Sequence, residues 1–215
     1  YQSAELDHQY SATRVRQADY LSILSNLDHF YFLRKLQLQC ELINLRNVFN
    51  TETDMLLIED ICELIVRNNF FQSPLIEVYY GILMMLTSPE KESEDYFLRV
   101  VKLINQSNTK FPIPDLNNTY QYVKNFCIRM INTGNDGYRK ILFELYKTIL
   151  SNKRIMNHGD FSPWEYKNIV TLGLRLQEEK WVREFIRKYL NFLPIDERAN
   201  ALTYNSAMLS YYHKN

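Results

Sequence analysis

The sequence predicts an all-α protein built as an α-solenoid, that is, a right-handed array of antiparallel helix pairs. Apolar residues recur at the three- and four-residue spacing of helices in almost every segment. The chain has only five glycines and six prolines, so the tight hairpins and phosphate-binding loops of other fold classes have few residues to form them. Successive helix pairs begin about 35 to 48 residues apart, which is typical of helical repeats.

The first half of the chain has five segments with helical periodicity. The expected helices span residues 3–24, 27–48, 54–68, 74–87 and 90–107. The first pattern is the weakest, and Ser25 or Asn26 is expected to end it by capping the second helix. Ser73-Pro74 supplies a hydroxyl cap and a first-turn proline for the fourth helix. This fourth helix is apolar on almost every side and is therefore expected to lie between neighbours.

The second half begins with a connection over residues 109–114 that carries two prolines. The helices expected after it span residues 116–133, 137–152, 163–177, 178–193 and 198–213. Asp115 is expected to cap the first of these helices, and Gly134 to end it in the left-handed conformation. Ser162-Pro163 again combines a cap with a first-turn proline, and Glu165 stands where its carboxylate can reach back to the cap.

We expect residues 1–215 to form a single helical-repeat domain, with its softest boundary in the irregular connection 153–161. The last predicted helix, 198–213, has no following helix to pair with. Because each pair of a helical array buries its face on the next, the sequence is expected to be a fragment of a longer protein. The same open face, expected to hold Leu202, Leu209 and Tyr211, would allow the chain to form homo-oligomers through its C-terminal helix.

The segment from Pro163 to Pro194 resembles a tetratricopeptide repeat, and residues 162–215 as a whole follow that style. The positions that carry the resemblance are Tyr166, Ile169, Val170, Ile186 and Pro194. Val182 and Tyr189 replace small residues of that family and are expected to widen the spacing of the two helices. The upstream pairs fit the signature poorly and are interpreted as generic helical repeats.

The resemblance implies a groove lined by the first helix of each pair, and hence a peptide-binding or protein-binding function. Positions spaced from Trp164 at helical intervals, together with two asparagines at equivalent points of the two units, give the expected binding set. It consists of Trp164, Lys167, Asn168, Thr171, Arg175 and Asn205. Leu174 is also expected to face this groove. In the alternative interpretation Asn168 and Asn205 bond neighbouring backbone between repeats, and the basic side chains are only solvated.

A second hypothesis is that the chain is a nucleic-acid-binding helical repeat. A basic stripe on helix 178–193 contains Lys180, Arg183, Arg187 and Lys188, with Trp181 and Tyr189 beside it. Against this, Lys plus Arg equals Asp plus Glu at 25 each, whereas nucleic-acid binders usually carry a basic excess. We therefore expect no nucleic acid partner.

Catalysis requires several reactive side chains at one site, and the sequence contains no such residues at the spacing of a known catalytic motif. The four histidines are scattered, and the three cysteines fit no metal or redox spacing. We therefore predict a non-enzyme without a metal or cofactor, with the non-catalytic part of a larger enzyme or regulator as an alternative. Buried free thiols favour a reducing compartment, so the chain is expected to be cytoplasmic. No apolar run is long enough for a membrane span.

Overall fold

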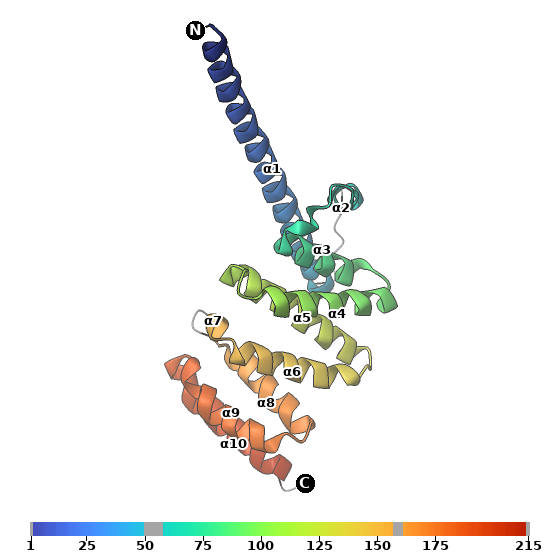
Figure 1. Ribbon diagram of the computed structural model, residues 1–215. Helices are drawn as coiled ribbons and strands as arrows, with labels where there is room; N and C mark the ends of the chain where they lie inside the picture. Colours follow the sequence, from blue (N-terminus) through green and yellow to red (C-terminus); the bar gives the residue numbers. More distant parts are fainter. Residues whose placement is uncertain (1, 50–57, 157–160, 214–215) are drawn as a thin grey trace. The chain divides into compact units, whose positions relative to one another are not determined.

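The computed structural model describes residues 2–49, 58–156 and 161–213. Within these ranges every regular element is a helix, and no strand occurs (Figure 1). This confirms the prediction of an all-α protein. The chain divides into two compact units, Tyr1–Thr109 and Lys110–Asn215. The division falls at the start of the two-proline connection, and the 153–161 connection lies inside the second unit.

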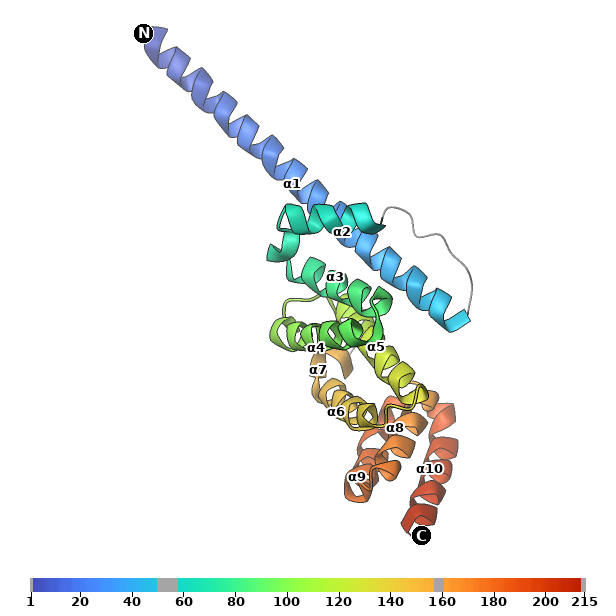
Figure 2. The same ribbon diagram turned by 90° about the vertical axis from the view of Figure 1, so that its right-hand side faces the viewer.

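The first unit begins with one very long helix. Its elements are α1 (Gln2–Phe49), α2 (Ile58–Arg67), the short 3-10 helix η1 (Phe70–Gln72), α3 (Pro74–Thr87) and α4 (Glu90–Ser107). The predicted break at Ser25 or Asn26 is wrong, because α1 runs through both residues without interruption (Figure 2). Serine and asparagine disfavour a helix interior by only a few tenths of a kcal/mol relative to the better helix formers. They therefore do not stop a helix whose flanks keep helical periodicity.

The core of the first unit is centred on α3, which packs against both α1 and α4. Its buried residues include Ile76, Tyr79, Ile82 and Leu83, which confirms that this helix lies between neighbours. Gly81 allows α4 to come close, since a Cβ atom placed there would lie 2.8 Å from Val100 Cγ2.

The second unit extends from α5 to the C-terminal helix α10. Its elements are α5 (Ile113–Asn132), α6 (Gly137–Ser151), α7 (Lys153–Met156), α8 (Pro163–Arg175), α9 (Glu179–Tyr189), the 3-10 helices η2 (Leu190–Phe192) and η3 (Ile195–Glu197), and α10 (Arg198–His213). Helix α6 packs against α5 and α8, and α8 packs against α9. Helix α10 contacts both α8 and α9 (Figure 1). The C-terminal helix thus has two partners within its own unit.

Helix boundaries follow the proline and glycine signals closely, with three corrections. Helix α5 begins at Ile113, so Pro112 and not Asp115 is its N-cap, and Asp115 lies in the first turn. Residues 153–156 form α7 where an irregular segment is predicted. Helix α9 ends at Tyr189 and continues only as the 3-10 turn η2. The beginning of the predicted helix 54–68 and residues 157–160 lie outside the described residues.

Two predicted cap residues of the second unit are in place, although the Glu165 carboxylate, expected to reach back to the cap of α8, pairs with Lys124 instead. Gly134 adopts a left-handed φ of 98° after α5, and Asn135 N–H donates to the Met130 carbonyl over 2.9 Å, which closes the helix end. At the start of α8, Ser162 Oγ accepts a hydrogen bond of 3.0 Å from the Glu165 backbone N–H. The Ser73 hydroxyl, in contrast, makes no capping bond at α3, although Pro74 does occupy the first turn.

The α8–α9 pair is close, contrary to the expectation that Val182 and Tyr189 widen it. A Cβ atom at Gly173 would lie 2.5 Å from Val182 Cγ2 and 3.1 Å from Phe143 Cε2. Because Gly173 has no side chain, the Val182 side chain of α9 can pack directly against the backbone of α8 at this position. The Tyr166 hydroxyl of α8 also donates a hydrogen bond of 2.7 Å to the Ile186 carbonyl of α9.

Candidate functional site

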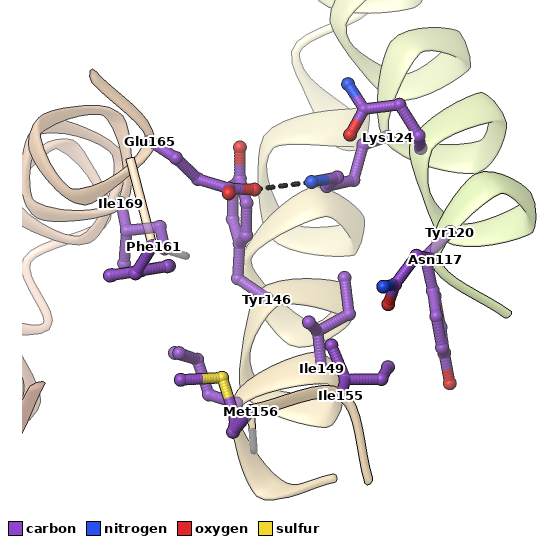
Figure 3. Close-up of a pocket in the computed structure, with 12 residues that line it drawn as sticks. Asn117, Tyr120, Lys124, Tyr146, Ile149, Ile155, Met156, Phe161, Glu165 and Ile169 are labelled. Atoms are coloured by element: carbon purple, nitrogen blue, oxygen red, sulfur yellow. Dashed lines mark hydrogen bonds and ion pairs between the residues drawn. The ribbon is translucent and has the colours of Figure 1, made fainter. Parts of the chain in front are cut away.

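The second unit contains a polar pocket of about 180 Å³ between α5, α6, α7 and α8 (Figure 3). Its lining residues are Asn117, Tyr120, Gln121, Lys124, Tyr146, Ile149, Leu150, Ile155, Met156, Phe161, Glu165 and Ile169. Lys124 of α5 and Glu165 of α8 form an ion pair across it. The side chains of this pair are 11% and 29% exposed. They therefore interact more strongly than a pair on the open surface.

The phenols of the pocket are held in their neutral form. Burial raises the pKa of the Tyr146 hydroxyl, and the Glu165 carboxylate raises it further. Burial likewise raises the pKa of Tyr120. The Lys124 ammonium lies 5.8 Å from the centroid of the Tyr146 ring, where a cation is attracted by the ring face. Both tyrosines therefore remain hydrogen-bond donors at neutral pH and are not available as bases.

Two polar atoms of this pocket are buried without a hydrogen-bond partner among the described residues. They are Asn117 Oδ1 and Tyr120 Oη. An amide oxygen accepts and a neutral phenol donates, so each of these two buried atoms lacks the partner that its chemistry requires.

The expected binding set of α8 lies together on one helix face. Trp164 is 69% exposed, Arg175 is also exposed, and Lys167, Asn168 and Thr171 are half-buried. Leu174, however, is 2% exposed and points into the core, so its assignment to the groove is wrong. It stands about a quarter turn away from the face that Trp164 and Thr171 share.

Lys167 is the best-defined residue of this face. Its ammonium lies 5.4 Å from the centroid of the Trp164 ring and 4.9 Å from the centroid of the Tyr204 ring. Tyr204 belongs to α10 and is itself 46% exposed. The three side chains therefore join α8 and α10 into one surface, which we call the α8–α10 face and define as Trp164, Lys167, Asn168, Thr171, Arg175 and Tyr204.

Asn205, the remaining member of the expected set, is not on this surface. It is 2% exposed, and its amide nitrogen donates to the Ala201 carbonyl of its own helix over 2.7 Å. The alternative, in which Asn205 bonds backbone between repeats, is therefore also wrong for this residue, because the bonded carbonyl belongs to its own helix. Leu209 is also buried, at 7% exposure, whereas Leu202 and Tyr211 are exposed. The expectation that Leu209 belongs to an open face is therefore wrong.

The basic stripe is on α9, and its four cations, Lys180, Arg183, Arg187 and Lys188, are all exposed. The aromatic residues beside them are engaged elsewhere. Trp181 stacks on Phe185 with centroids 5.2 Å apart and planes 14° apart. Tyr189 is buried, and its hydroxyl donates to the Leu150 carbonyl over 3.3 Å. The stripe thus offers charge without the exposed ring faces on which bases stack.

The Lys124–Glu165 ion pair and the position of Tyr204 beside Lys167 could not be predicted from the sequence. Lys124 and Glu165 are 41 residues apart, and only tertiary packing brings them together. Tyr204 is conspicuous as an aromatic residue, but its role beside Lys167 depends on the packing of α10 against α8.

Comparisons with protein-family models, with curated proteins and with solved structures gave no match. Among the helices that the structure describes, none combines the length and the apolar character that a membrane span requires. In the same part of the chain, no three His, Cys, Asp or Glu side chains gather in a way that could hold a metal ion.

Proposed function

We propose that this chain is a non-enzymatic interaction module that binds a peptide or a partner protein on its α8–α10 face. The observation that carries the proposal is the pair of exposed rings, Trp164 and Tyr204, with the ammonium of Lys167 over both. Tryptophan and tyrosine are enriched among the residues that supply most of the binding energy at protein interfaces, and the lysine held over their rings adds a fixed positive charge.

The arrangement favours binding because Lys167 is already positioned. A lysine side chain in solution loses considerable rotamer freedom when it is fixed by a ligand. Here the two ring faces attract the ammonium before any ligand arrives, and each contact contributes about 0.5–1 kcal/mol at an exposed site. A carboxylate that approaches Lys167 therefore meets a cation that needs little further ordering.

The chemistry of the face indicates the class of ligand. Arg175 adds a second cation three turns along α8 from Trp164, while Thr171 lies between them on the same face. On α10, Met208 and Tyr211 follow Tyr204 at the four- and seven-residue spacing that keeps side chains on one side of a helix. We infer a segment with an acidic group against Lys167 and an apolar side chain against Trp164.

The finer architecture belongs to the same proposal. The close α8–α9 pair, followed by α10 on both helices, supports a tetratricopeptide-like unit at the C-terminal end of an α-solenoid. The three free cysteines, two of them buried, support a reducing compartment, and we propose the cytoplasm.

Nucleic acid is the weaker candidate partner. The α9 stripe supplies exposed cations, but Trp181 and Tyr189 are held in the aromatic cluster of the second unit. A non-catalytic segment of a larger enzyme or regulator is compatible with the same α8–α10 face, because such segments also act by binding.

A peptide selection tests the proposal. Random peptides are displayed on phage and selected on the immobilised full chain, and the affinities of the selected peptides are measured by fluorescence anisotropy. We expect enrichment of acidic peptides whose affinity falls about tenfold in Lys167→Ala or Trp164→Ala, equivalent to about 1.4 kcal/mol. Lys180→Ala on α9 is the matched control and should change the affinity less than twofold. Equal loss in Lys180→Ala, or no loss in the α8 variants, would refute the proposed face.

A further inference from the structure

Helix α1 carries an apolar stripe that the described residues of the first unit leave about half exposed. The stripe contains Tyr20, Leu24, Leu27, Tyr31, Leu38 and Leu45, which are between 44% and 66% exposed. We call these six residues the α1 stripe. Leu24, Tyr31, Leu38 and Leu45 follow one another at intervals of seven residues, and Tyr20 and Leu27 stand at the alternate apolar positions of the same heptads. This is the pattern of a coiled-coil seam.

The stripe lies on the side of α1 away from the core of the first unit. The buried residues of α1 are Phe32, Leu36, Gln39, Cys40 and Ile43. At about 100° per residue they centre on a direction roughly opposite to the stripe. The Cys40 thiol donates to the Tyr79 carbonyl of α3 over 3.5 Å, and the Phe32 ring lies 4.7 Å from the Phe70 ring of η1. Helix α1 is therefore anchored by one face and exposes the α1 stripe on the other.

The exposed area is large enough for a stable interface. From Tyr20 to Tyr31 the stripe is flanked by Ile23 and Phe30, which are 60% and 66% exposed. These two residues and the four stripe residues of that segment expose roughly 700 Å². Each partner of a stable protein complex buries about 800 Å². A patch of this size on a free helix marks an interaction site.

The charges beside the stripe disfavour a membrane surface as its occupant. Over residues 14–45, which contain the whole stripe, four basic residues are nearly balanced by three acidic ones: Arg14, Arg16, Arg34 and Lys35 against Asp19, Asp28 and Glu41. Helices that bind anionic membranes in the interfacial plane instead have a polar face rich in lysine and arginine. The polar face of α1 has no such excess in this segment.

Around Leu24 and Leu27 the stripe is complementary to itself in either orientation, because an in-register parallel pair also sets tyrosine against tyrosine and leucine against leucine. When two copies of α1 run antiparallel about a centre between Ser25 and Asn26, Tyr20 faces Tyr31 of the second copy, and Leu24 faces Leu27. Aromatic rings then meet aromatic rings, and leucines meet leucines, in consecutive layers.

The heptad positions after Leu27 decide between the two orientations. They are occupied by Arg34 and Glu41. A parallel pair would place each of these residues opposite its own copy, so that like charges meet twice in the seam. In the antiparallel pair Arg34 faces Gln17 of the second copy, which can accept a hydrogen bond from the guanidinium. Like charges in a seam are costly, and polar seam residues are known to select orientation and register.

We propose that the chain forms a homodimer through the α1 stripe, with the two α1 helices antiparallel and Leu24 of each copy against Leu27 of the other. The dimer would carry two α8–α10 faces, so a ligand with two binding segments would be held by avidity. The dimer itself does not depend on the function proposed for that face.

Sedimentation equilibrium of the full chain tests the dimer. We expect a dimer for the natural sequence and a rise in its dissociation constant of at least about 100-fold in Leu24→Glu, because each dimer would then bury two carboxylates in the seam. Leu24 is exposed and glutamate is a good helix former, so the variant keeps its fold, and an unchanged circular dichroism spectrum verifies this. Leu98→Glu on α4, where the leucine is 62% exposed, is the matched control and should leave the dimer intact.

Disulfide crosslinking tests the orientation. A mixture of Tyr20→Cys and Tyr31→Cys chains should form the mixed disulfide under mild oxidation, whereas either variant alone should not crosslink. The native thiols interfere little, because Cys40 and Cys127 are buried and partial burial raises the pKa of Cys62 to about 11, which leaves few thiolates at neutral pH.

Four results would overturn the proposal. The first is a chain that stays monomeric, and the second is a dimer that Leu24→Glu does not weaken. The third is a dimer abolished by Tyr211→Asp, which would move the interface to α10. The fourth is crosslinking of either cysteine variant with its own copies, which would contradict the antiparallel arrangement. Sedimentation with phosphatidylcholine–phosphatidylserine vesicles adds a check, since binding by a chain that remains monomeric would assign the stripe to lipid.

Discussion

Gly173→Ala is expected to destabilise the second unit, although alanine is the better helix former. The added Cβ atom would lie 2.5 Å from Val182 Cγ2 and 3.1 Å from Phe143 Cε2. Both distances are shorter than ordinary van der Waals contact, so α8 and α9 must separate or Val182 must move. Val182 is fully buried, and its branched side chain has few alternative rotamers.

The size of the effect follows from two opposing contributions. Inserting a methyl group into a filled core destabilises a protein by about 1–3 kcal/mol. Replacing glycine by alanine inside a helix stabilises it by about 0.5–1 kcal/mol. We therefore expect a net loss of about 1–2 kcal/mol in the free energy of unfolding.

A compensating substitution sharpens this prediction. Val182→Ala alone removes buried methyl groups and should destabilise the unit by about 1–3 kcal/mol. In the double variant the new methyl of residue 173 occupies part of the vacated space. The destabilisation of the double variant should thus fall short of the sum of the single effects by at least about 1 kcal/mol.

Urea unfolding followed by tryptophan fluorescence is the appropriate assay. The two tryptophans of the chain, Trp164 and Trp181, both belong to the second unit, so their emission reports on that unit alone. Gly137→Ala is the matched control, because a Cβ atom there would approach only Asn135 Oδ1, at 3.4 Å, and the variant should be as stable as the natural chain or more so. If Gly173→Ala matched the control, or if the two substitutions were additive, the close α8–α9 contact would be refuted.

Three further predictions use the same assay. Ser162→Ala should destabilise the second unit by about 0.5–2 kcal/mol, because it removes the hydroxyl that accepts a hydrogen bond from the Glu165 backbone N–H. The control Ser151→Ala, at the exposed end of a helix, should have a smaller effect. Lys124→Met should destabilise the second unit by about 1–3 kcal/mol, because it leaves the Glu165 carboxylate unpaired. Adding Glu165→Gln should recover part of this loss. A double variant that is less stable than Lys124→Met would contradict the pairing. Burial raises the pKa of Cys127 from 9.0 to about 12, so the folded state keeps a proton that the unfolded state releases. The contribution of this thiol to the free energy of unfolding is therefore complete below pH 9 and falls between pH 9 and about 12. Cys127→Ser should make the free energy of unfolding fall less steeply over this pH range. An unchanged fall would show that Cys127 is not its source.

Helix positions could be predicted well at several sites, including the prolines that precede α3 and α4, although two prolines did not prevent an error of three residues at the start of α5. The predicted limits 74–87, 90–107 and 198–213 coincide with α3, α4 and α10. Where the signal was a polar side chain alone, prediction failed. Ser25 and Asn26 were interpreted as a cap but lie inside α1, because a side chain can cap a helix only if the backbone also ends there.

Which surface a residue reaches was harder to predict. Helical spacing correctly placed Trp164, Lys167 and Thr171 on one face, since that depends only on the geometry of one helix. The burial of Asn205 depends on how α10 sits on α8 and α9, and no local pattern contains that information. The Lys124–Glu165 pair was missed for the same reason. Glu165 appeared to be a capping residue, and its backbone N–H does bond the cap, but its carboxylate pairs with α5.

Affinity capture most directly tests the claim that this chain is a protein-binding module. The full chain is immobilised, exposed to an extract of the cells that produce it, with and without nuclease, and the retained proteins are identified by mass spectrometry. Two variants run in parallel: Trp164→Ala with Lys167→Ala on the α8–α10 face, and Lys180→Ala with Arg183→Ala on α9. Our account predicts a protein partner that survives nuclease, disappears with the α8 variant and remains with the α9 variant. Partners that vanish on nuclease treatment and with the α9 variant would contradict it and assign the chain to nucleic acid.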